Sequence, residues 1–398
     1  MTSPDSLPPA PAKRFALFLP APVALLLGVL FAFTLLFVYR RYSLTFGTGD
    51  DHANMLLEGE AFLRGNYLLS HWYLTTVTWY TTDIMLYAIG IRLRGMDPVL
   101  MHEVPAVVFA TMVCVVMYLA ARNRDAPGGF RWQGAVVAFA LIGLPLESLA
   151  SHLLLGPWRS VSILIGLIAF ALIGKGDRSS VALWRLAALF VMIVIVIIAD
   201  NFPLYVIVAP VLIVCALRAW QLPETRRAEA GIAIAVLLGV VVAKLCLRAI
   251  PAAGGFTVPD TIAGNIRLVE FDNIGRNFGW TVHTVQVLYG ADFWGLPIGL
   301  QMVARFLRLL LIALVFWGMV HTLRPLTRRL SLQTAATLAS TDRVDLYLAL
   351  AMMINLLAYW LTNIAYYLEA QRYLVLFCVF GATLAGRVVS RLFADDAV

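Results

Sequence analysis

The chain has very little charge for its length. Only 13% of its 398 residues are charged, whereas 61% are hydrophobic. A water-soluble domain of this composition would expose a very large apolar surface, so a soluble globular protein is excluded. The net charge of +7 does not indicate nucleic acid. The basic residues stand mainly in short groups between apolar stretches, where they set membrane topology.

Cysteine is also scarce, and its spacing indicates neither a metal site nor a disulfide framework. Cys114, Cys215, Cys246 and Cys378 all lie within or at the ends of apolar stretches, and we interpret them as small packing residues. The sequence contains no HExxH, Walker or GxSxG motif. A metalloprotease, an ATP-driven pump and a serine hydrolase therefore have no support.

Long apolar stretches make up most of the chain. A bilayer core takes roughly 20 apolar residues per crossing, and we predict an all-α, polytopic transmembrane bundle of about 10–11 membrane segments. Residues 1–14 are predicted to be a disordered, proline-rich cytoplasmic tail, and 15–398 a single transmembrane domain. The stretches lie at about 15–39, 76–91, 99–121, 133–150, 159–174, 186–199, 203–218, 229–250, 303–322, 344–366 and 373–390.

Basic clusters between these stretches predict the topology. Arginine and lysine concentrate on the cytoplasmic side of membrane proteins. Lys13 and Arg14 precede the first stretch, which is therefore predicted to run outward. Residues 40–80 then form a first outer loop and 251–300 a second large one, and the carboxyl terminus lies inside. This alternation requires 76–91 to dip into the outer leaflet or lie at its surface. The rival account, in which it crosses and a later segment does not, stays open.

An acidic pair, Asp50-Asp51, follows the first apolar stretch where the chain leaves the bilayer. One interpretation is a solvated turn, because the preceding Gly-Thr-Gly is good turn chemistry. The other is a carboxylate that takes a proton from an acceptor hydroxyl, or a pair that binds a divalent cation. The amphipathic run Ala53–Leu63 comes next, and it predicts a helix lying along the membrane surface.

These features together resemble a known family. An outward first helix, the acidic pair, a surface helix ending in Leu63-Arg64-Gly65-Asn66-Tyr67, and the segment Trp72–Tyr87 look like the polytopic glycosyltransferases of the GT-C fold. The likeness extends to bacterial relatives of protein O-mannosyltransferases and aminoarabinose transferases. It implies that Asp50 or Asp51 is the catalytic base and that a polyprenyl-phosphate-linked sugar is the donor. Ser70-His71-Trp72-Tyr73 stands where the family carries a Lys-Pro-Pro element.

Cations at the predicted outer helix ends are a second signal, because positive-inside statistics place few there. Long basic side chains that reach the lipid headgroups are one explanation. A bound lipid phosphate is the other, since arginine holds phosphate through its bidentate fork. Arg372 is the foremost candidate, because the related enzymes often carry an Arg-Tyr pair before the last helix. The candidates for the donor phosphate are Arg372, Arg159, Lys244, Arg248, Arg305 and Arg308.

Four further polar residues lie at the same predicted level, namely Asp83, Glu147, His152 and Asp200. An ionisable group between very apolar helices is costly and often functional, so we place all four among the candidate substrate-binding residues. The alternatives are a plain tight turn at Asp200 and a satisfied polar residue at an interface for His152.

We therefore expect a glycosyltransferase that moves a sugar to an acceptor at the periplasmic face. The family likeness implies the bacterial inner membrane, and the acceptor is a glycan, a lipid or a protein. No cofactor is required, although Mg or Mn at Asp50 and Asp51 is compatible with the pattern. Membrane lipids are expected partners and nucleic acid is not. The alternatives are a transporter or flippase of a lipid-linked or anionic solute, and a surface-polysaccharide polymerase or ligase. Transporters usually show internal repeats, and none is evident.

Overall fold

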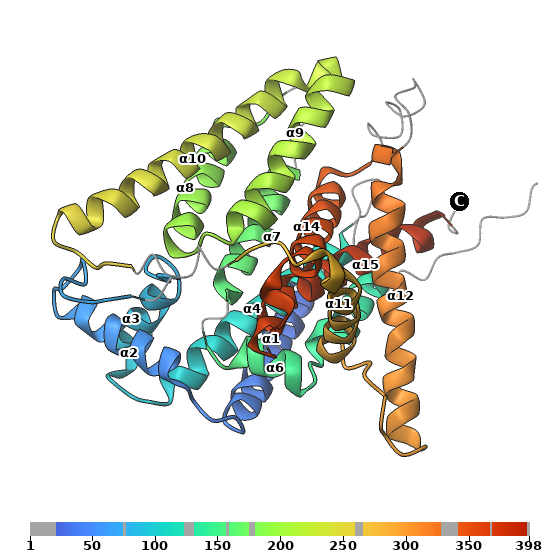
Figure 1. Cartoon of the computed structure of the whole chain (residues 1–398), viewed down its shortest axis with the longest axis horizontal. Coiled ribbons are helices and arrows are strands. Elements are labelled where there is room, and N and C mark those ends of the chain that lie inside the picture. The colour runs from blue at the N-terminus through green and yellow to red at the C-terminus, as the bar shows by residue number, and fades with distance from the viewer. Residues whose placement is uncertain are drawn as a thin grey trace, which may run out of the picture.

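The computed structural model describes residues 21–74, 77–122, 131–156, 159–174, 180–258, 266–327, 341–366 and 368–395. Within these ranges the chain forms helices and no β-strand. Two isolated β-bridges join residues that lie between the helices. The helices gather into one bundle, shown in Figure 1. The predicted cytoplasmic tail, 1–14, lies outside the described residues.

Seven helices among the described residues are long and apolar enough to cross a bilayer. The protein is thus an all-α, multi-pass membrane protein, as predicted. An eighth span arises if α5 (Trp132–Ala138) and η1 (Phe139–Gly143) are counted with α6 (Glu147–Leu154), which bends away by 88°. The seven lie in α1 (Ala21–Ser43), α4 (Leu100–Ala121), η2–α9 (Leu204–Gln221), α10 (Arg226–Ala252), α12 (Leu300–Thr327), α14 (Arg343–Leu361) and α15 (Val375–Asp395).

The remaining apolar stretches form helices of fewer than 18 residues. α7 (Ser160–Gly174) has 15 residues and α8 (Leu183–Ala199) has 17. α3 (Asp83–Arg94) has only 12, which gives it a length of about 18 Å against a hydrocarbon core of about 30 Å. For this reason fewer helices among the described residues are long enough to cross than the ten or eleven segments predicted. α3 is too short to cross.

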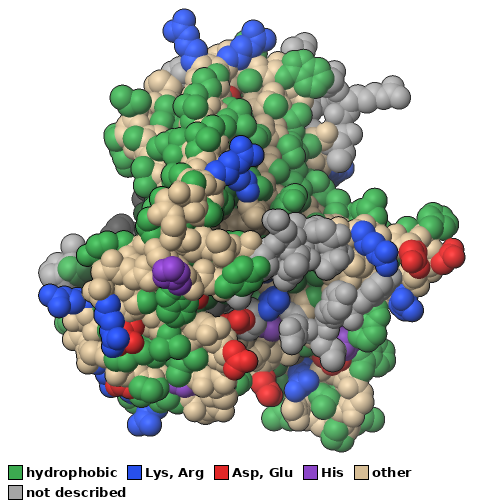
Figure 2. Space-filling model, turned by 60° about the vertical axis from the view of Figure 1, so that its left-hand side comes forward, with side chains coloured by type: hydrophobic (Ala, Val, Ile, Leu, Met, Phe, Trp, Pro, Cys, Tyr) green, Lys and Arg blue, Asp and Glu red, His purple; other side chains and the backbone are tan. Residues whose placement is uncertain are grey.

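The last helix, α15, is the centre of the bundle. In its most apolar part 94% of the residues are buried, compared with 28% for α10 and 22% for α12. Small residues allow close packing there, since a Cβ on Gly386 would lie 2.5 Å from the Cβ of Ala120 and from the carbonyl oxygen of Gly134. α10 and α12 lie at the periphery and present apolar side chains outward. Figure 2 shows hydrophobic side chains covering the upper part of one face and charged ones gathering below.

One end of the bundle carries α2 (Asp50–Leu63) and α3, and we call it the α2 end. The predicted surface helix is α2, which begins three residues earlier than expected. Two contacts fix this region to the end of α8: the Thr78 hydroxyl donates to the Ile198 carbonyl at 2.6 Å, and the Trp79 N–H to Ala199 at 3.0 Å. The segment that follows α10 also contacts this region, because the Phe256 N–H donates to the Leu68 carbonyl at 2.8 Å.

The opposite end is closed by buried ion pairs. Glu229 at the start of α10 binds Arg218 of α9 at 2.9 Å and Arg343 of α14 at 2.8 Å, and all three side chains are at most 4% exposed. Arg387 of α15 binds Asp342, the residue that caps α14, at 2.8 Å. Removing one partner of such a buried pair is strongly destabilising, so this end is held shut.

Candidate functional site

The acidic pair forms the first turn of α2. Gly49 precedes the helix in an extended conformation, with φ −109° and ψ 176°. Asp50 is exposed and Asp51 is half-buried. Carboxylates in a first helical turn are favoured by the positive end of the helix dipole, and this location keeps both accessible to an incoming molecule.

His52, the next residue, connects α2 to the segment between α6 and α7. Its Nδ1 accepts the N–H of Gly49 at 3.0 Å. The ring proton is therefore on Nε2, which donates to the carbonyl of Leu155. Gly156 lies directly on the ring with a φ of +101°, and a Cβ there would be 2.2 Å from the imidazole. The imidazole and the glycine backbone are thus in close contact.

Arg159 ends the same segment, at most about 14 Å along the chain from Leu155. Its Nε binds Asp200 Oδ2 at 2.5 Å, and the two side chains are 9% and 4% exposed. The guanidinium also lies over two rings, 4.8 Å from the centroid of Phe202 and 4.5 Å from that of Tyr373. Arg159 has a φ of +69°, a conformation that costs a non-glycine residue energy and that clusters at functional sites.

Arg372 contacts the same tyrosine. Its guanidinium is 5.6 Å from the centroid of the Tyr373 ring. His152 hydrogen-bonds Gln371 and faces the positive charge of Arg372. Sequence-predicted residues from α6, the α6–α7 segment, the end of α8 and η7 (Leu368–Leu374), which precedes α15, are therefore brought together. We call Arg159, Asp200, Arg372, Tyr373 and His152 the arginine cluster.

Two buried carboxyl groups lie on the helices beside this cluster. Burial raises the pKa of Asp83 to about 7, and the charge of Asp200 adds to this, although a 2.9 Å hydrogen bond from Thr82 acts against it. Burial likewise raises the pKa of Glu58 to about 8, with a further contribution from Asp51. Glu58 was missed in the sequence. It lies seven residues, or about two turns, after Asp51, so the two share a helix face.

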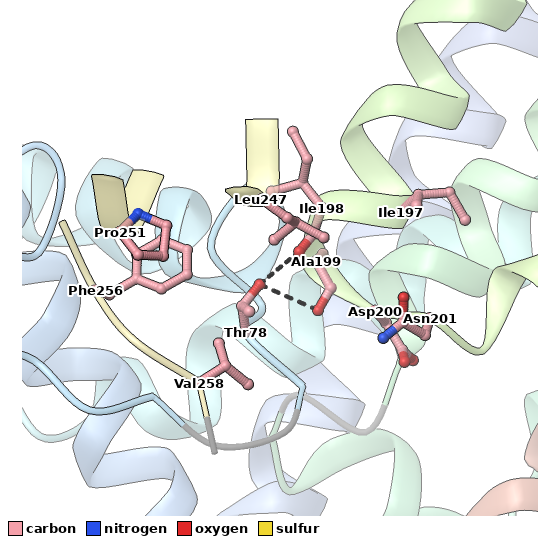
Figure 3. A pocket seen from close by; sticks show the side chains of 10 residues that line it. All are labelled: Thr78, Ile197, Ile198, Ala199, Asp200, Asn201, Leu247, Pro251, Phe256 and Val258. Atoms are coloured by element: carbon pink, nitrogen blue, oxygen red, sulfur yellow. Dashed lines mark hydrogen bonds between the residues drawn. The ribbon is translucent and has the colours of Figure 1, made fainter. Parts of the chain in front are cut away.

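A cavity of about 210 Å³ lies between the ends of α8 and α10 (Figure 3). Leu247 and Pro251 of α10 line one side, and Asp200 and Asn201 line another. Lys244 reaches its edge, because the Lys244 ammonium donates to Asn201 Oδ1 at 2.5 Å. The complete lining is Thr78, Ile197, Ile198, Ala199, Asp200, Asn201, Leu247, Pro251, Phe256 and Val258.

The remaining candidates stand apart from the arginine cluster. Arg305 and Arg308 donate to the carbonyls of Asp292 and Tyr289, at 2.8 and 3.0 Å, near the connection between α11 (Ile274–Leu288) and α12. Glu147 is exposed at the start of α6, and Arg248 is exposed on α10. The predicted phosphate-binding cations thus fall into separate groups, because they lie on different helices.

The described residues contain no group of three or more His, Cys, Asp or Glu side chains that could hold a metal ion. A divalent cation at Asp50 and Asp51 therefore remains a prediction without a ligand set. Comparison of the chain with protein-family models, with curated proteins and with solved structures returns no match.

Proposed function

We propose that the protein is a membrane glycosyltransferase of the GT-C type that transfers a sugar from a polyprenyl-phosphate donor. In this proposal the α2 end faces the periplasm of a bacterial inner membrane, and the acceptor reaches the site there. The arginine cluster holds the phosphate of the donor, and a carboxylate in the first turn of α2 is the general base.

The observation that carries the proposal is the connection made by His52. The contact of His52 with Leu155 joins the start of α2 to the segment that ends at Arg159. This supports a site in which the accessible carboxylates of α2 and the buried arginine cluster lie close together at one end of the bundle. A lipid phosphate needs charge-assisted donors at the membrane surface, and an acceptor hydroxyl needs a nearby base. Arg159 and Arg372 are suited to the first role and Asp51 or Asp50 to the second.

The reaction is a single displacement at the anomeric carbon. The acceptor hydroxyl gives its proton to the carboxylate as its oxygen bonds to the sugar. The bond from the anomeric carbon to the phosphate oxygen breaks, and polyprenyl phosphate leaves with the electron pair. The arginines stabilise the charge that grows on the leaving phosphate.

The closed opposite end weighs against the transporter interpretation. A transporter that alternates access must open each end of its bundle in turn. At the opposite end Glu229 binds arginines from two other helices, and all of these side chains are buried. Opening that end would break these ion pairs, at a cost of about 3–5 kcal/mol for each pair. An enzyme that works only at the α2 end has no such requirement.

The test is the release of polyprenyl phosphate from a lipid-linked sugar by purified Asp50→Asn and Asp51→Asn variants. Loss of the general base should lower turnover by about 10²–10⁴-fold in one of them. Asp272→Asn is the matched control, because Asp272 is also an exposed carboxylate in a helical turn.

Full activity of both variants would remove the carboxylate pair from the mechanism. An equal loss in the Asp272→Asn control would show that the assay reports only surface charge. Release of polyprenyl diphosphate in place of the monophosphate would favour a polysaccharide polymerase or ligase. Movement of intact sugar-lipid across a vesicle membrane, with no release, would favour a flippase.

A further inference from the structure

The outward face of α10 changes character along its length. Leu237, Val241, Lys244 and Arg248 are spaced by four, three and four residues, which places them on one side of the helix. Leu237 and Val241 are 50% and 54% exposed and lie nearer the middle of the span. The two cations follow toward the α2 end. An apolar stripe thus leads directly into a cationic pair.

The cavity lies beside this cationic pair and extends beyond it along α10. Leu247 and Pro251, which share the helix face with Lys244, form its α10 side. Seven residues separate Lys244 from Pro251, a rise of about 10 Å along the axis. From the bilayer outward the apolar stripe therefore leads to the cations, and the cavity lies beside and beyond them.

The charge of this pair is not cancelled by acidic side chains. Lys244 donates to the amide oxygen of Asn201, and Arg248 is exposed. Among the described residues neither forms an ion pair with a carboxylate. An anion can bind here without displacing an internal carboxylate.

The cavity beyond the cations has both apolar and hydrogen-bonding walls. Phe256, Val258 and Leu247 provide apolar surface, and Asn201 and Asp200 provide oxygen acceptors. Its volume of about 210 Å³ is below the roughly 300–1,000 Å³ of pockets that enclose drug-sized ligands. It admits a small hydroxylated group and excludes an oligosaccharide or a folded peptide segment.

We propose that this face binds the acceptor, and that the acceptor is a membrane lipid with one phosphate and a small, hydroxyl-bearing head group. Its tail lies along Leu237 and Val241, its phosphate binds Lys244 and Arg248, and its head group enters the cavity. Asp200, which lines the cavity, also binds Arg159, so the head group ends beside the proposed donor site. The assignment of this lipid as the acceptor rests on the proposed function, whereas the lipid site itself does not.

The binding test uses the full-length protein in nanodiscs with phosphatidylglycerol as the probe. Phosphatidic acid is the first comparison: it is anionic, but its head group has no hydroxyl beyond the phosphate. Phosphatidylcholine, which is zwitterionic, is the second. Retention of each lipid is measured by native mass spectrometry. We expect phosphatidylglycerol to bind most tightly. Lys244→Gln with Arg248→Gln should weaken its binding about 30-fold, since each cation near an anionic headgroup contributes about five- to sixfold.

The matched control is Arg226→Gln with Arg227→Gln, two exposed arginines at the other end of the same helix. It should leave phosphatidylglycerol binding unchanged. Val258→Phe fills the cavity without altering charge. It should weaken phosphatidylglycerol to the level of phosphatidic acid and leave phosphatidic acid itself unaffected.

Equal losses in the Lys244/Arg248 and Arg226/Arg227 variants would overturn the site. Equal binding of phosphatidylglycerol and phosphatidic acid, unaffected by Val258→Phe, would overturn the head-group assignment. The binding readout needs no turnover, so its failure is distinguishable from failure of the proposed function. If the Lys244/Arg248 variant loses lipid binding but transfers sugar at the wild-type rate, the lipid is not the acceptor.

Discussion

Asp200→Asn is the substitution that most directly tests the arginine cluster. The change keeps the shape of the side chain and its contact with the Phe202 N–H, which Asp200 accepts at 2.9 Å. It removes the charge that faces Arg159 at 2.5 Å, where the two side chains are only 9% and 4% exposed. Arg159 then stays buried without its carboxylate. Removing one partner of such a buried pair costs about 3–5 kcal/mol.

A second substitution separates the charge from the packing. In the double variant Arg159→Leu, Asp200→Asn no uncompensated charge remains. The loss is then limited mainly to the contacts of the guanidinium with two aromatic rings, about 0.5–2 kcal/mol each. We therefore expect the double variant to be more stable than Asp200→Asn alone, although it carries one more substitution. It should still fail to transfer sugar if Arg159 binds the donor phosphate.

The assay is unfolding by SDS in mixed micelles, followed by tryptophan fluorescence. A loss of 3–5 kcal/mol is a large part of the roughly 5–15 kcal/mol that stabilises a typical protein, so the shift in midpoint should be large. A cost below about 1 kcal/mol for Asp200→Asn would show that the pair behaves as a solvated surface pair, as such pairs usually contribute no more than that. Losses that simply add in the double variant would show that the two side chains are not coupled.

Three other predictions concern stability. Because burial raises the pKa of Glu58 to about 8 and of Asp83 to about 7, their stabilising contribution is complete below their ordinary pKa values. This contribution is lost as the pH rises through 7–8, so the melting temperature should fall between pH 5 and pH 8.5. The fall should be smaller in the Glu58→Gln variant. A melting temperature that rises with pH would contradict this prediction. Gly156→Ala should destabilise the protein by at least about 1–3 kcal/mol in the SDS titration, because it combines a positive φ with a clash against His52, and an unchanged midpoint would refute that contact. Glu229→Ala should cost about 3–5 kcal/mol in the same titration because two buried arginines share this carboxylate, whereas a wild-type midpoint would show that the opposite end is not closed by these pairs.

The spans and the surface helix could be predicted from the sequence because their signals are local. Long apolar runs mark α1, α4 and α10, and the amphipathic run after Asp51 marks α2. Short runs were less informative. The run 76–91 was expected to dip into the outer leaflet or lie at its surface, and crossing was the rival account. The turn at Trp79–Thr82 shortens its helix to 12 residues.

The composition of the arginine cluster could be predicted only in part. Arg159, Asp200 and Arg372 were each singled out by their charge at a helix end. Arg159 and Arg372 meet at Tyr373, and Asp200 binds Arg159. This convergence depends on how the helices pack, which no local pattern encodes. Glu58 was missed for the same reason, since its carboxyl looks like part of the polar face of a surface helix. Its burial comes from the packing of α2 on α3 and on the bundle.

Three cations near the α2 end are held by neutral oxygens, and this bears on function. At the opposite end buried arginines are bound by carboxylates: Arg218 and Arg343 share that of Glu229, and Arg387 binds Asp342. At the α2 end Arg159 is also bound by a carboxylate, that of Asp200. Lys244, by contrast, binds an amide oxygen, and Arg305 and Arg308 bind backbone carbonyls. A neutral partner orients a cation without cancelling its charge, so an arriving phosphate gains most of the attraction. Neutralising Lys244 should therefore weaken anion binding while changing stability little, the reverse of the effect expected for Glu229.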